Sequence, residues 1–219
     1  MSQSMLARYK LIIFDWDGTL MDSVPKIIDS FHRAASSIPD LPVRTDEEFK
    51  ATIGQSIEVA FSELYPDASN LQQESWLVAF RDAFFADHSV GKQLFHSALL
   101  LLDQLKANGQ LIAVATGKKR HGLDKDLANN ALLDFFDATR CSDETASKPD
   151  PKMVVEILEK LNCRPSDALL IGDSHHDMQL AVNAGVDALG LTHGVADREI
   201  LEQYQPIAIA DDLQELLEQ

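Results

Sequence analysis

The sequence predicts an α/β fold: a doubly wound, Rossmann-like parallel sheet with a small α-helical cap domain inserted after the first strand. In the second half of the chain, short apolar runs alternate with stretches of helical spacing, which is typical of βαβ units. The first apolar run instead precedes about seventy residues of helical periodicity, far longer than an ordinary crossover. A length of 219 residues fits one domain that carries such an insertion.

The first predicted strand is the continuous apolar run Leu11–Phe14, which ends in the turn residues of 15–18. Runs without polar residues are typical of strands buried on both faces, as in a parallel sheet. Further runs predict strands at 111–115, 168–171, 186–191 and 207–210, with a weaker one at 138–141.

Helical spacing fills the segments between these strands. Leucines at 99, 102 and 105 precede Gly109, a typical C-terminal stop. Residues 151–161 predict a helix with proline in its first turn, and residues 178–184 predict another that ends at Gly185. The residues of the 151–161 helix that we expect to point inward are Val154, Val155, Leu158 and Leu161.

The segment from Ser23 to about Phe95 carries the predicted cap. Its apolar residues form two stripes of helical spacing, and we expect the aromatic ones to pack within the cap. We therefore place the core domain at 1–22 and 95–219 and the cap at 23–94. The alternative is one thick helical layer within a single domain. The two stripes are Ile27, Ile28, Phe31 and Ala35, and then Trp76, Phe80, Phe84 and Phe85.

Composition and charge exclude several classes of partner. The chain is 45% hydrophobic and 25% charged, which is ordinary for a globular protein. Nineteen basic against thirty-five acidic residues give a net charge of −16, so we expect neither nucleic acid nor an anionic membrane as a partner. No apolar run approaches the roughly 20 residues of a membrane helix, and the start lacks a signal-peptide pattern. With only Cys141 and Cys163, we expect a reducing, cytoplasmic location.

Acidic residues follow two of the predicted strands. Asp15 and Asp17 come directly after the first strand, and Asp173 and Asp177 follow the strand at 168–171. In open α/β sheets, ligands bind at the carboxyl ends of the strands. Carboxylates gathered there repel one another unless a cation lies between them, and a cluster of oxygen donors suits Mg²⁺. The adjacent residues His175 and His176 do not readily face one ion, which disfavours a transition-metal site.

Two further strand ends carry candidate phosphate ligands. Thr116 and Gly117 follow the strand at 111–115 and offer a hydroxyl and a main-chain N–H. Lys148 precedes the 151–161 helix and could neutralise a phosphate or a carboxylate nucleophile. Each signal alone is weak, since a turn or a surface lysine explains it equally well.

Together, and in this order, the four segments resemble the motifs of the haloacid dehalogenase superfamily of phosphohydrolases, in particular its phosphoglycolate phosphatase-like branch. Residues 15–23 match the first motif and Thr116 the second. Lys148 matches the third, and residues 172–177 match the fourth. The helical insert is similar to the family's cap domain, and the resemblance covers nearly the whole chain.

The resemblance implies a role for each catalytic residue. Asp15 would be the nucleophile that forms an aspartyl-phosphate, and Asp17 would protonate the leaving oxygen and then activate water. Lys148 would offset the charge on Asp15 and on the phosphate. Thr116 and the Gly117 amide, together with Lys148, would bind the substrate.

The resemblance also implies a Mg²⁺ cofactor. A carboxylate oxygen of Asp15, the main-chain carbonyl of Asp17 and the carboxylate of Asp173 would hold the ion. Asp177 would support this metal site from nearby, through water.

The expected activity is that of a Mg²⁺-dependent phosphatase, with a small phosphorylated metabolite as partner and phosphoglycolate as the first candidate substrate. An aspartate at position 17 disfavours the dehalogenases of this superfamily, and Thr19 favours a phosphatase over a phosphoglucomutase. There are two alternatives: a phosphomutase that acts on a sugar phosphate, and a non-catalytic module that binds a phosphate ligand.

Less specific features leave their interpretation open. Residues 118–120 form a basic run that either steers anions or, as we prefer, is a solvated loop. The turn at 52–56 is a candidate to face the core, and Arg44, Lys50 and Arg81 are candidate anion contacts, though surface ion pairs explain them better. The sequence leaves the oligomeric state open.

Overall fold

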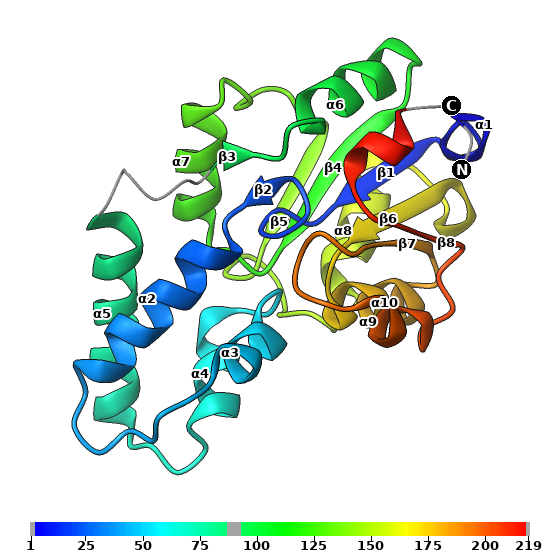
Figure 1. Ribbon diagram of the computed structural model, residues 1–219. Coiled ribbons are helices and arrows are strands. Elements are labelled where there is room, and N and C mark those ends of the chain that lie inside the picture. Colours follow the sequence, from blue (N-terminus) through cyan, green and yellow to red (C-terminus); the bar gives the residue numbers. More distant parts are fainter. Residues whose placement is uncertain (1–2, 87–92, 218–219) are drawn as a thin grey trace.

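The computed structural model describes residues 3–86 and 93–217. A six-stranded sheet forms the larger part, and a group of helices lies beside it (Figure 1). The strand order is β5-β4-β1-β6-β7-β8, and every neighbouring pair is parallel. The predicted doubly wound parallel sheet is therefore confirmed. The strands are β1 (Leu11–Phe14), β4 (Leu111–Thr116), β5 (Ala138–Cys141), β6 (Ala168–Gly172), β7 (Asp187–Leu191) and β8 (Ala208–Ala210).

Both faces of the sheet are buried. Successive side chains of a strand point to opposite faces, so the residues of β1 lie alternately in two hydrophobic clusters. Ile12 and Phe14 of β1 belong to one hydrophobic cluster, and Leu11 and Ile13 belong to another. The first cluster includes residues of the helices α6 (Ala98–Ala107) and α7 (Arg120–Asn129), of the short helix α1 (Gln3–Leu6) and of the 3-10 turn η2 (Leu213–Leu216). The second includes residues of α8 (Lys152–Leu161), α9 (His175–Ala184) and α10 (Arg198–Glu202), and the 3-10 turn η1 (Pro165–Asp167) leads from α8 to β6.

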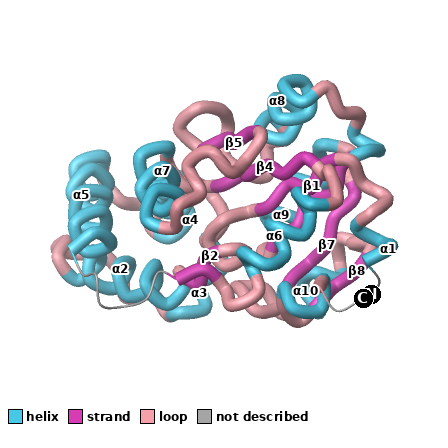
Figure 2. Tube along the Cα trace, turned by 90° about the horizontal axis from the view of Figure 1, so that it is seen from above, coloured by secondary structure: helices cyan, strands magenta, loops and turns pink. Residues whose placement is uncertain are grey.

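The helices between β1 and α6 have a hydrophobic cluster of their own. Phe31, Phe49, Phe61 and Trp76 are buried in it, so the predicted packing of the aromatic residues within the cap is confirmed. In Figures 1 and 2 these helices lie at the end of the molecule opposite β8. The cap helices are α2 (Val24–Ser36), α3 (Asp46–Thr52), α4 (Ile57–Leu64) and α5 (Asn70–Ala86).

A two-stranded antiparallel ribbon joins the exit from the core to the return. It consists of β2 (Met21–Asp22) and β3 (Gln93–Leu94), with Met21 opposite Leu94. The sequence analysis missed this pair, because strands of two residues are too short to show any periodicity. The boundaries 1–22, 23–94 and 95–219 stay predictions, and residues 87–92 of the predicted cap lie outside the described residues.

Three helices differ from their predictions. The sequence analysis missed α7, whose polar sequence has a weak apolar stripe. Helix α9 begins at His175 rather than at residue 178, because Ser174 caps it. In α8, Val155 is 39% exposed, whereas Met153 and Ile157 fill the core side. The inward direction predicted for Val155 is therefore wrong, while Gly109 and Gly185 follow their helices as predicted and adopt positive φ.

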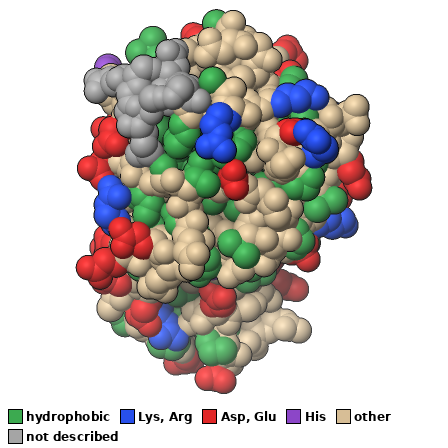
Figure 3. Space-filling model, turned by 90° about the vertical axis from the view of Figure 1, so that its right-hand side faces the viewer, with side chains coloured by type: hydrophobic (Ala, Val, Ile, Leu, Met, Phe, Trp, Pro, Cys, Tyr) green, Lys and Arg blue, Asp and Glu red, His purple; other side chains and the backbone are tan. Residues whose placement is uncertain are grey.

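None of the described helices combines the length and apolar content that crossing a bilayer requires. The face shown in Figure 3 carries acidic side chains beside scattered basic and apolar ones.

Candidate active site

The parallel register brings two of the predicted acidic residues together. Phe14 at the end of β1 is paired with Ile171 of β6, and the Asp15 N–H donates to the Ile171 carbonyl over 3.0 Å. Asp15 and Asp173 therefore follow neighbouring strand ends. This is where the open α/β sheet was expected to bind its ligand.

The loop after β1 fits closely around Asp173. Gly18 has a φ of +86°, and a Cβ atom there would lie 2.3 Å from Asp173 Oδ2, so only glycine is accommodated. Thr19 Oγ1 donates to Asp173 Oδ1 over 2.6 Å, and the Val195 N–H donates to Oδ2 over 2.9 Å. These contacts fix the Asp173 carboxylate in a single orientation.

Lys148 is fully buried between two carboxylates. Its Nζ lies 2.7 Å from Asp15 Oδ1 and 2.6 Å from Asp177 Oδ1. Asp177 is held by the capping box of α9, in which Ser174 Oγ accepts from the Asp177 N–H and Asp177 Oδ2 accepts from the Ser174 N–H. The capping box that begins α9 thus also positions Asp177 beside Lys148.

Three buried carboxylates meet beside Lys148. One oxygen from each of Asp15, Asp173 and Asp177 lies within 4.8 Å of the others. A cluster of oxygen donors of this kind fits a hard divalent ion such as Mg²⁺. One carboxylate oxygen of Asp177 belongs to this cluster, and the role through water that was expected for Asp177 stays a prediction.

Burial is the main influence on the protonation of these groups. It raises the pKa of Asp15 well above its usual range; Lys148 opposes this shift, and Asp177 and Asp173 add to it. Burial, followed by the charge of Asp177, raises the pKa of Asp173 to about 7. Burial lowers the pKa of Lys148, but Asp15 and Asp177 outweigh it, so this pKa is raised overall. A bound cation would relieve the repulsion among the carboxylates.

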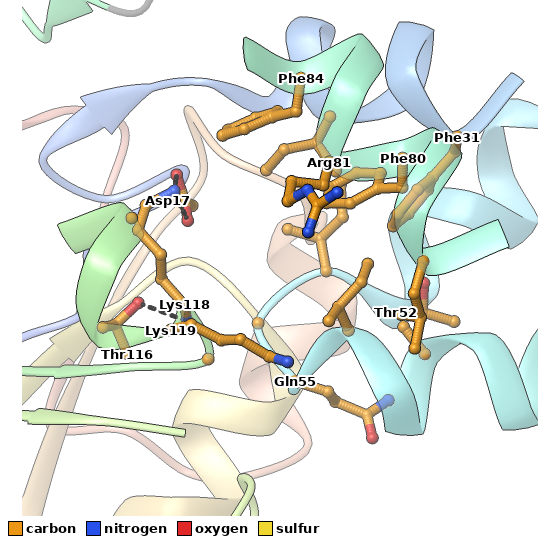
Figure 4. A pocket seen from close by; sticks show the side chains of 18 of the residues that line it. Asp17, Phe31, Thr52, Gln55, Phe80, Arg81, Phe84, Thr116, Lys118 and Lys119 are labelled. Carbon is orange, nitrogen blue, oxygen red and sulfur yellow. Dashed lines mark hydrogen bonds and ion pairs between the residues drawn. The ribbon is translucent and has the colours of Figure 1, made fainter. Parts of the chain in front are cut away.

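The Asp17 carboxylate lies apart from this cluster. Ser23 Oγ donates to Asp17 Oδ1 over 2.6 Å, and Lys118 Nζ lies 2.8 Å from Asp17 Oδ2 (Figure 4). The metal contact predicted for Asp17 was through its main-chain carbonyl, and it stays a prediction.

Lys118 is almost completely buried, with 8% of its side chain exposed. Its Nζ lies 3.4 Å from Asp126 Oδ2, which also accepts from the indole N–H of Trp16 over 3.3 Å, and 4.9 Å from the centre of the Phe84 ring. Burial lowers the pKa of Lys118, but the nearby carboxylates of Asp17 and Asp126 outweigh this effect, so the pKa is raised overall.

The basic run at 118–120 is therefore only partly solvated, and each of its three side chains has an acidic partner. Beside the buried Lys118, Lys119 Nζ lies 2.5 Å from Glu58 Oε1 and Arg120 pairs with Glu144 over 2.7 Å. The preferred interpretation as a solvated loop is wrong for Lys118.

Thr116 and Gly117 lie at the end of β4, where they face the cap. Thr116 Oγ1 accepts from the Lys118 N–H over 3.2 Å. A Cβ atom at Gly117 would lie 2.2 Å from the Gln55 carbonyl oxygen, so glycine permits the α3–α4 turn to approach. The phosphate-binding roles of both residues stay predictions.

The turn at 52–56 reaches the core as anticipated. The Ser56 N–H donates to Ser147 Oγ over 2.8 Å, and a ring nitrogen of His176 lies 3.0 Å from the Ala51 carbonyl oxygen. Of the candidate anion contacts in the cap, Arg44 pairs with Glu48 over 2.8 Å. Lys50 lines a second, more open groove, and Arg81 lines the main cavity.

A cavity of about 390 Å³ lies between the strand ends and the cap. Asp15, Asp17, Thr116 and Gly117 line it from the core, and apolar side chains of α2 and α5 line it from the cap (Figure 4). The predicted residues Asp15, Asp17, Thr116 and Gly117 thus share one hollow, while Lys148 and Asp173 lie behind Asp15.

Asp126 escaped the sequence analysis, whereas Gln55 was part of the turn that was expected to face the core. Asp126 lies within the polar helix α7, where nothing in the sequence distinguishes it from a solvent-exposed acid, yet it is 3% exposed. Gln55 lies in the predicted turn, but its place in the cavity wall depends on how the cap meets the core.

Comparison with known proteins identifies the family. The sequence model of the haloacid dehalogenase-like hydrolase family matches residues 12–191 of this chain. The pyrophosphatase PpaX of Bacillus cereus (strain G9842) is 29% identical over 212 residues, which cover 96% of this chain and 95% of that protein.

Solved structures agree with this assignment. A haloacid dehalogenase-like hydrolase from Bacteroides fragilis superposes with a TM-score of 0.87 at 30% identity, covering 95% of this chain and 99% of that one. A predicted phosphoglycolate phosphatase from Haemophilus somnus 129pt gives a TM-score of 0.85 at 25% identity, covering 99% and 98%.

The fold and the site define a hydrolase built on a Rossmann-like parallel sheet with a helical cap. The chain belongs to the haloacid dehalogenase-like hydrolase family. This membership confirms the predicted superfamily and the predicted enzyme class, a phosphohydrolase.

Proposed function

We propose that the protein is a Mg²⁺-dependent phosphatase that hydrolyses a small phosphomonoester through an aspartyl-phosphate on Asp15. The observation that carries this proposal is the buried Lys148, bound to Asp15 and Asp177 beside Asp173. Phosphoryl transfer depends mainly on positioning and on the neutralisation of charge, and this arrangement supports both.

Asp15 attacks phosphorus, so that a new P–O bond forms while the bond to the leaving alcohol breaks. Asp17, held at the cavity wall by Ser23 and Lys118, gives its proton to the leaving oxygen. Asp17 then takes a proton from water, which attacks phosphorus and releases phosphate and the free Asp15 carboxylate.

The remaining residues hold the reacting groups. Thr116 Oγ1 and the Gly117 N–H bind phosphoryl oxygens, and Lys148 offsets the charge of Asp15. Asp15, Asp173 and the main-chain carbonyl of Asp17 would hold Mg²⁺, whose charge would stabilise the phosphoryl oxygens in the transition state.

A phosphate-release assay with and without Mg²⁺ tests the proposal, using a panel that includes phosphoglycolate and pyrophosphate. We expect Asp15→Asn to abolish turnover while the thermal unfolding midpoint shows a folded protein. Asp22→Asn, a nearby and exposed change, serves as the matched control and should retain activity. Near-normal turnover by Asp15→Asn would remove the mechanism.

The same panel decides between the alternatives. Isomer formation from a hexose phosphate without phosphate release would indicate a phosphomutase. Ligand binding without turnover of any compound would indicate a binding module.

We further propose a cytoplasmic location. Cys141 and Cys163 are both free cysteines, and Cys141 is buried, which agrees with a reducing compartment.

A further inference from the structure

We infer that the leaving group of the substrate is bulky, uncharged and apolar, and that an aromatic ring fits it best. This inference rests on the proposed function, because it concerns the alcohol that departs when Asp15 attacks phosphorus. It separates this chain from relatives named for compounds whose leaving group is small and anionic.

The wall of the cavity opposite the catalytic residues is apolar. Phe80 and Leu77 of α5 and Ile27 and Phe31 of α2 line it together with Phe84 (Figure 4). At about 390 Å³, the cavity falls in the range of sites that enclose small organic molecules, roughly 300–1,000 Å³. An apolar group placed there would leave water as it enters, which favours binding.

The rings of this wall are held in a fixed arrangement. The Phe80 ring stacks on Trp76, with centroids 5.6 Å apart and 10° between planes, and on Phe84 at 5.5 Å and 19°. The Phe31 ring lies 5.2 Å from that of Phe80, with 43° between the two planes. Because its neighbours fix it, the half-buried Phe80 offers a preformed aromatic surface to a ligand ring.

The cations that line the cavity already have acidic partners. Lys118 is bound by Asp17, and Lys119 by Glu58. Arg81 is 62% exposed and lies 3.5 Å from Asp82. A second carboxylate or phosphate on the substrate would therefore meet phenyl rings and cations that already have acidic partners, Arg81 among them, and its desolvation would be poorly offset.

Three substrates that all release a primary alcohol test the inference: 2-phenylethyl phosphate, ethyl phosphate and 2-phosphoglycolate. Because all three leaving groups are primary alkoxides, the differences in their intrinsic reactivity are small. We expect kcat/KM for 2-phenylethyl phosphate to exceed that of the other two by at least about tenfold, the effect of filling an apolar pocket. Equal or higher values for ethyl phosphate or 2-phosphoglycolate would overturn the inference.

Variants locate the effect in the wall. Phe80→Ala should lower the ratio of kcat/KM for 2-phenylethyl phosphate to kcat/KM for ethyl phosphate by about tenfold. Leu71→Ala is the matched control in the same helix, because Leu71 is 72% exposed and lies outside the cavity lining. If Phe80→Ala does not fold, Phe80→Leu should show a smaller loss of the same selectivity. An unchanged preference in the folded variant would contradict the inference.

A binding measurement separates this inference from the proposed function. Calorimetric titration with 2-phenylethylphosphonate and ethylphosphonate reports affinity without turnover. If no phosphomonoester is hydrolysed, the proposed function fails, and tighter binding of the phenylethyl compound still supports the apolar cavity. If phosphomonoesters are hydrolysed but both phosphonates bind equally, only the inference fails.

Discussion

Lys148 is the residue on which the site depends most. A buried ammonium is costly unless it is paired, and here one carboxylate from each side compensates it. Conversely, Asp15, Asp173 and Asp177 would repel one another strongly in a buried site without a cation nearby. The lysine therefore links the stability of the fold to the chemistry of the site.

Removing this charge should damage both properties. We expect Lys148→Met to lower kcat by at least about a hundredfold. It should also lower the free energy of unfolding in metal-free buffer by about 3–5 kcal/mol, the usual effect of breaking a buried ion pair. Phosphate release and urea unfolding measure the two effects. Lys152→Met, which removes an ammonium on a side chain that is 57% exposed and lies outside the cavity lining, is the control, and a Lys148→Met protein as active as this control would contradict the assigned role.

Tyr9, a residue remote from the site, makes the free energy of unfolding depend on pH in the alkaline range. The buried Tyr9 hydroxyl donates to Asp187 Oδ2 over 2.5 Å, and burial, followed by the hydrogen bond and charge of Asp187, raises the pKa of Tyr9 to about 12 from 10.0. Because folding favours the neutral phenol, this contribution is fully present below pH 10 and is lost as pH rises through 12.

Tyr9→Phe should therefore lower the free energy of unfolding by about 1 kcal/mol at pH 8. Its difference from the natural protein should shrink as pH rises from 10 to 12. Denaturant unfolding at a series of pH values measures this. A difference in the free energy of unfolding that grows from pH 10 to pH 12 would contradict the raised pKa of Tyr9.

Among the elements, we propose that the turn between α3 and α4 closes the site. It approaches β4 so closely that only a glycine at 117 leaves room for the Gln55 carbonyl. It also donates a hydrogen bond from Ser56 to Ser147 of the core. Lids of this kind exclude water and complete the catalytic arrangement.

Gly117→Ala should hold this turn away from the core, because the added methyl group would overlap main-chain atoms of Gln55 and Gly54. We expect kcat to fall and KM to rise, by about a hundredfold together in kcat/KM, the cost of misplacing a bound group by about an ångström. Steady-state kinetics with a thermal unfolding control measure this. Unchanged kinetics in a folded variant would show that the turn does not close over the substrate.

At the scale of elements, the sequence predicted the strands that have continuous apolar runs and the polar residues that follow those strands. The apolar run Leu11–Phe14 predicted the strand β1, and the acidic residues after it predicted the candidate site, since parallel strands bring their carboxyl ends to one edge. The ribbon β2–β3 was too short to predict, and the apolar stripe of α7 was too weak. Contacts between distant segments, such as that of Lys118 with Asp126, depend on the docking of helices and leave no local signal.

The whole molecule carries a net charge of −16, and the lysines beside the cavity are paired with acids. A dianionic phosphate therefore approaches a field that repels it. Salt screens such a field, since the Debye length falls from about 30 Å at 0.01 M to about 10 Å at 0.1 M.

We consequently expect kcat/KM for a phosphomonoester to increase as ionic strength rises over this interval at saturating Mg²⁺. Initial rates at low substrate concentration, with a neutral inert salt varied, report the dependence. A steady decrease would instead indicate net attraction toward the mouth of the cavity.

Chemical trapping during turnover tests the central claim most directly. Acid quenching followed by borohydride reduction would convert a phosphorylated aspartate into homoserine, which peptide mass spectrometry can locate. We predict homoserine at position 15, and its loss in Asp15→Asn. Turnover with homoserine at another residue, or with none at all, would contradict the assignment of Asp15 as the nucleophile.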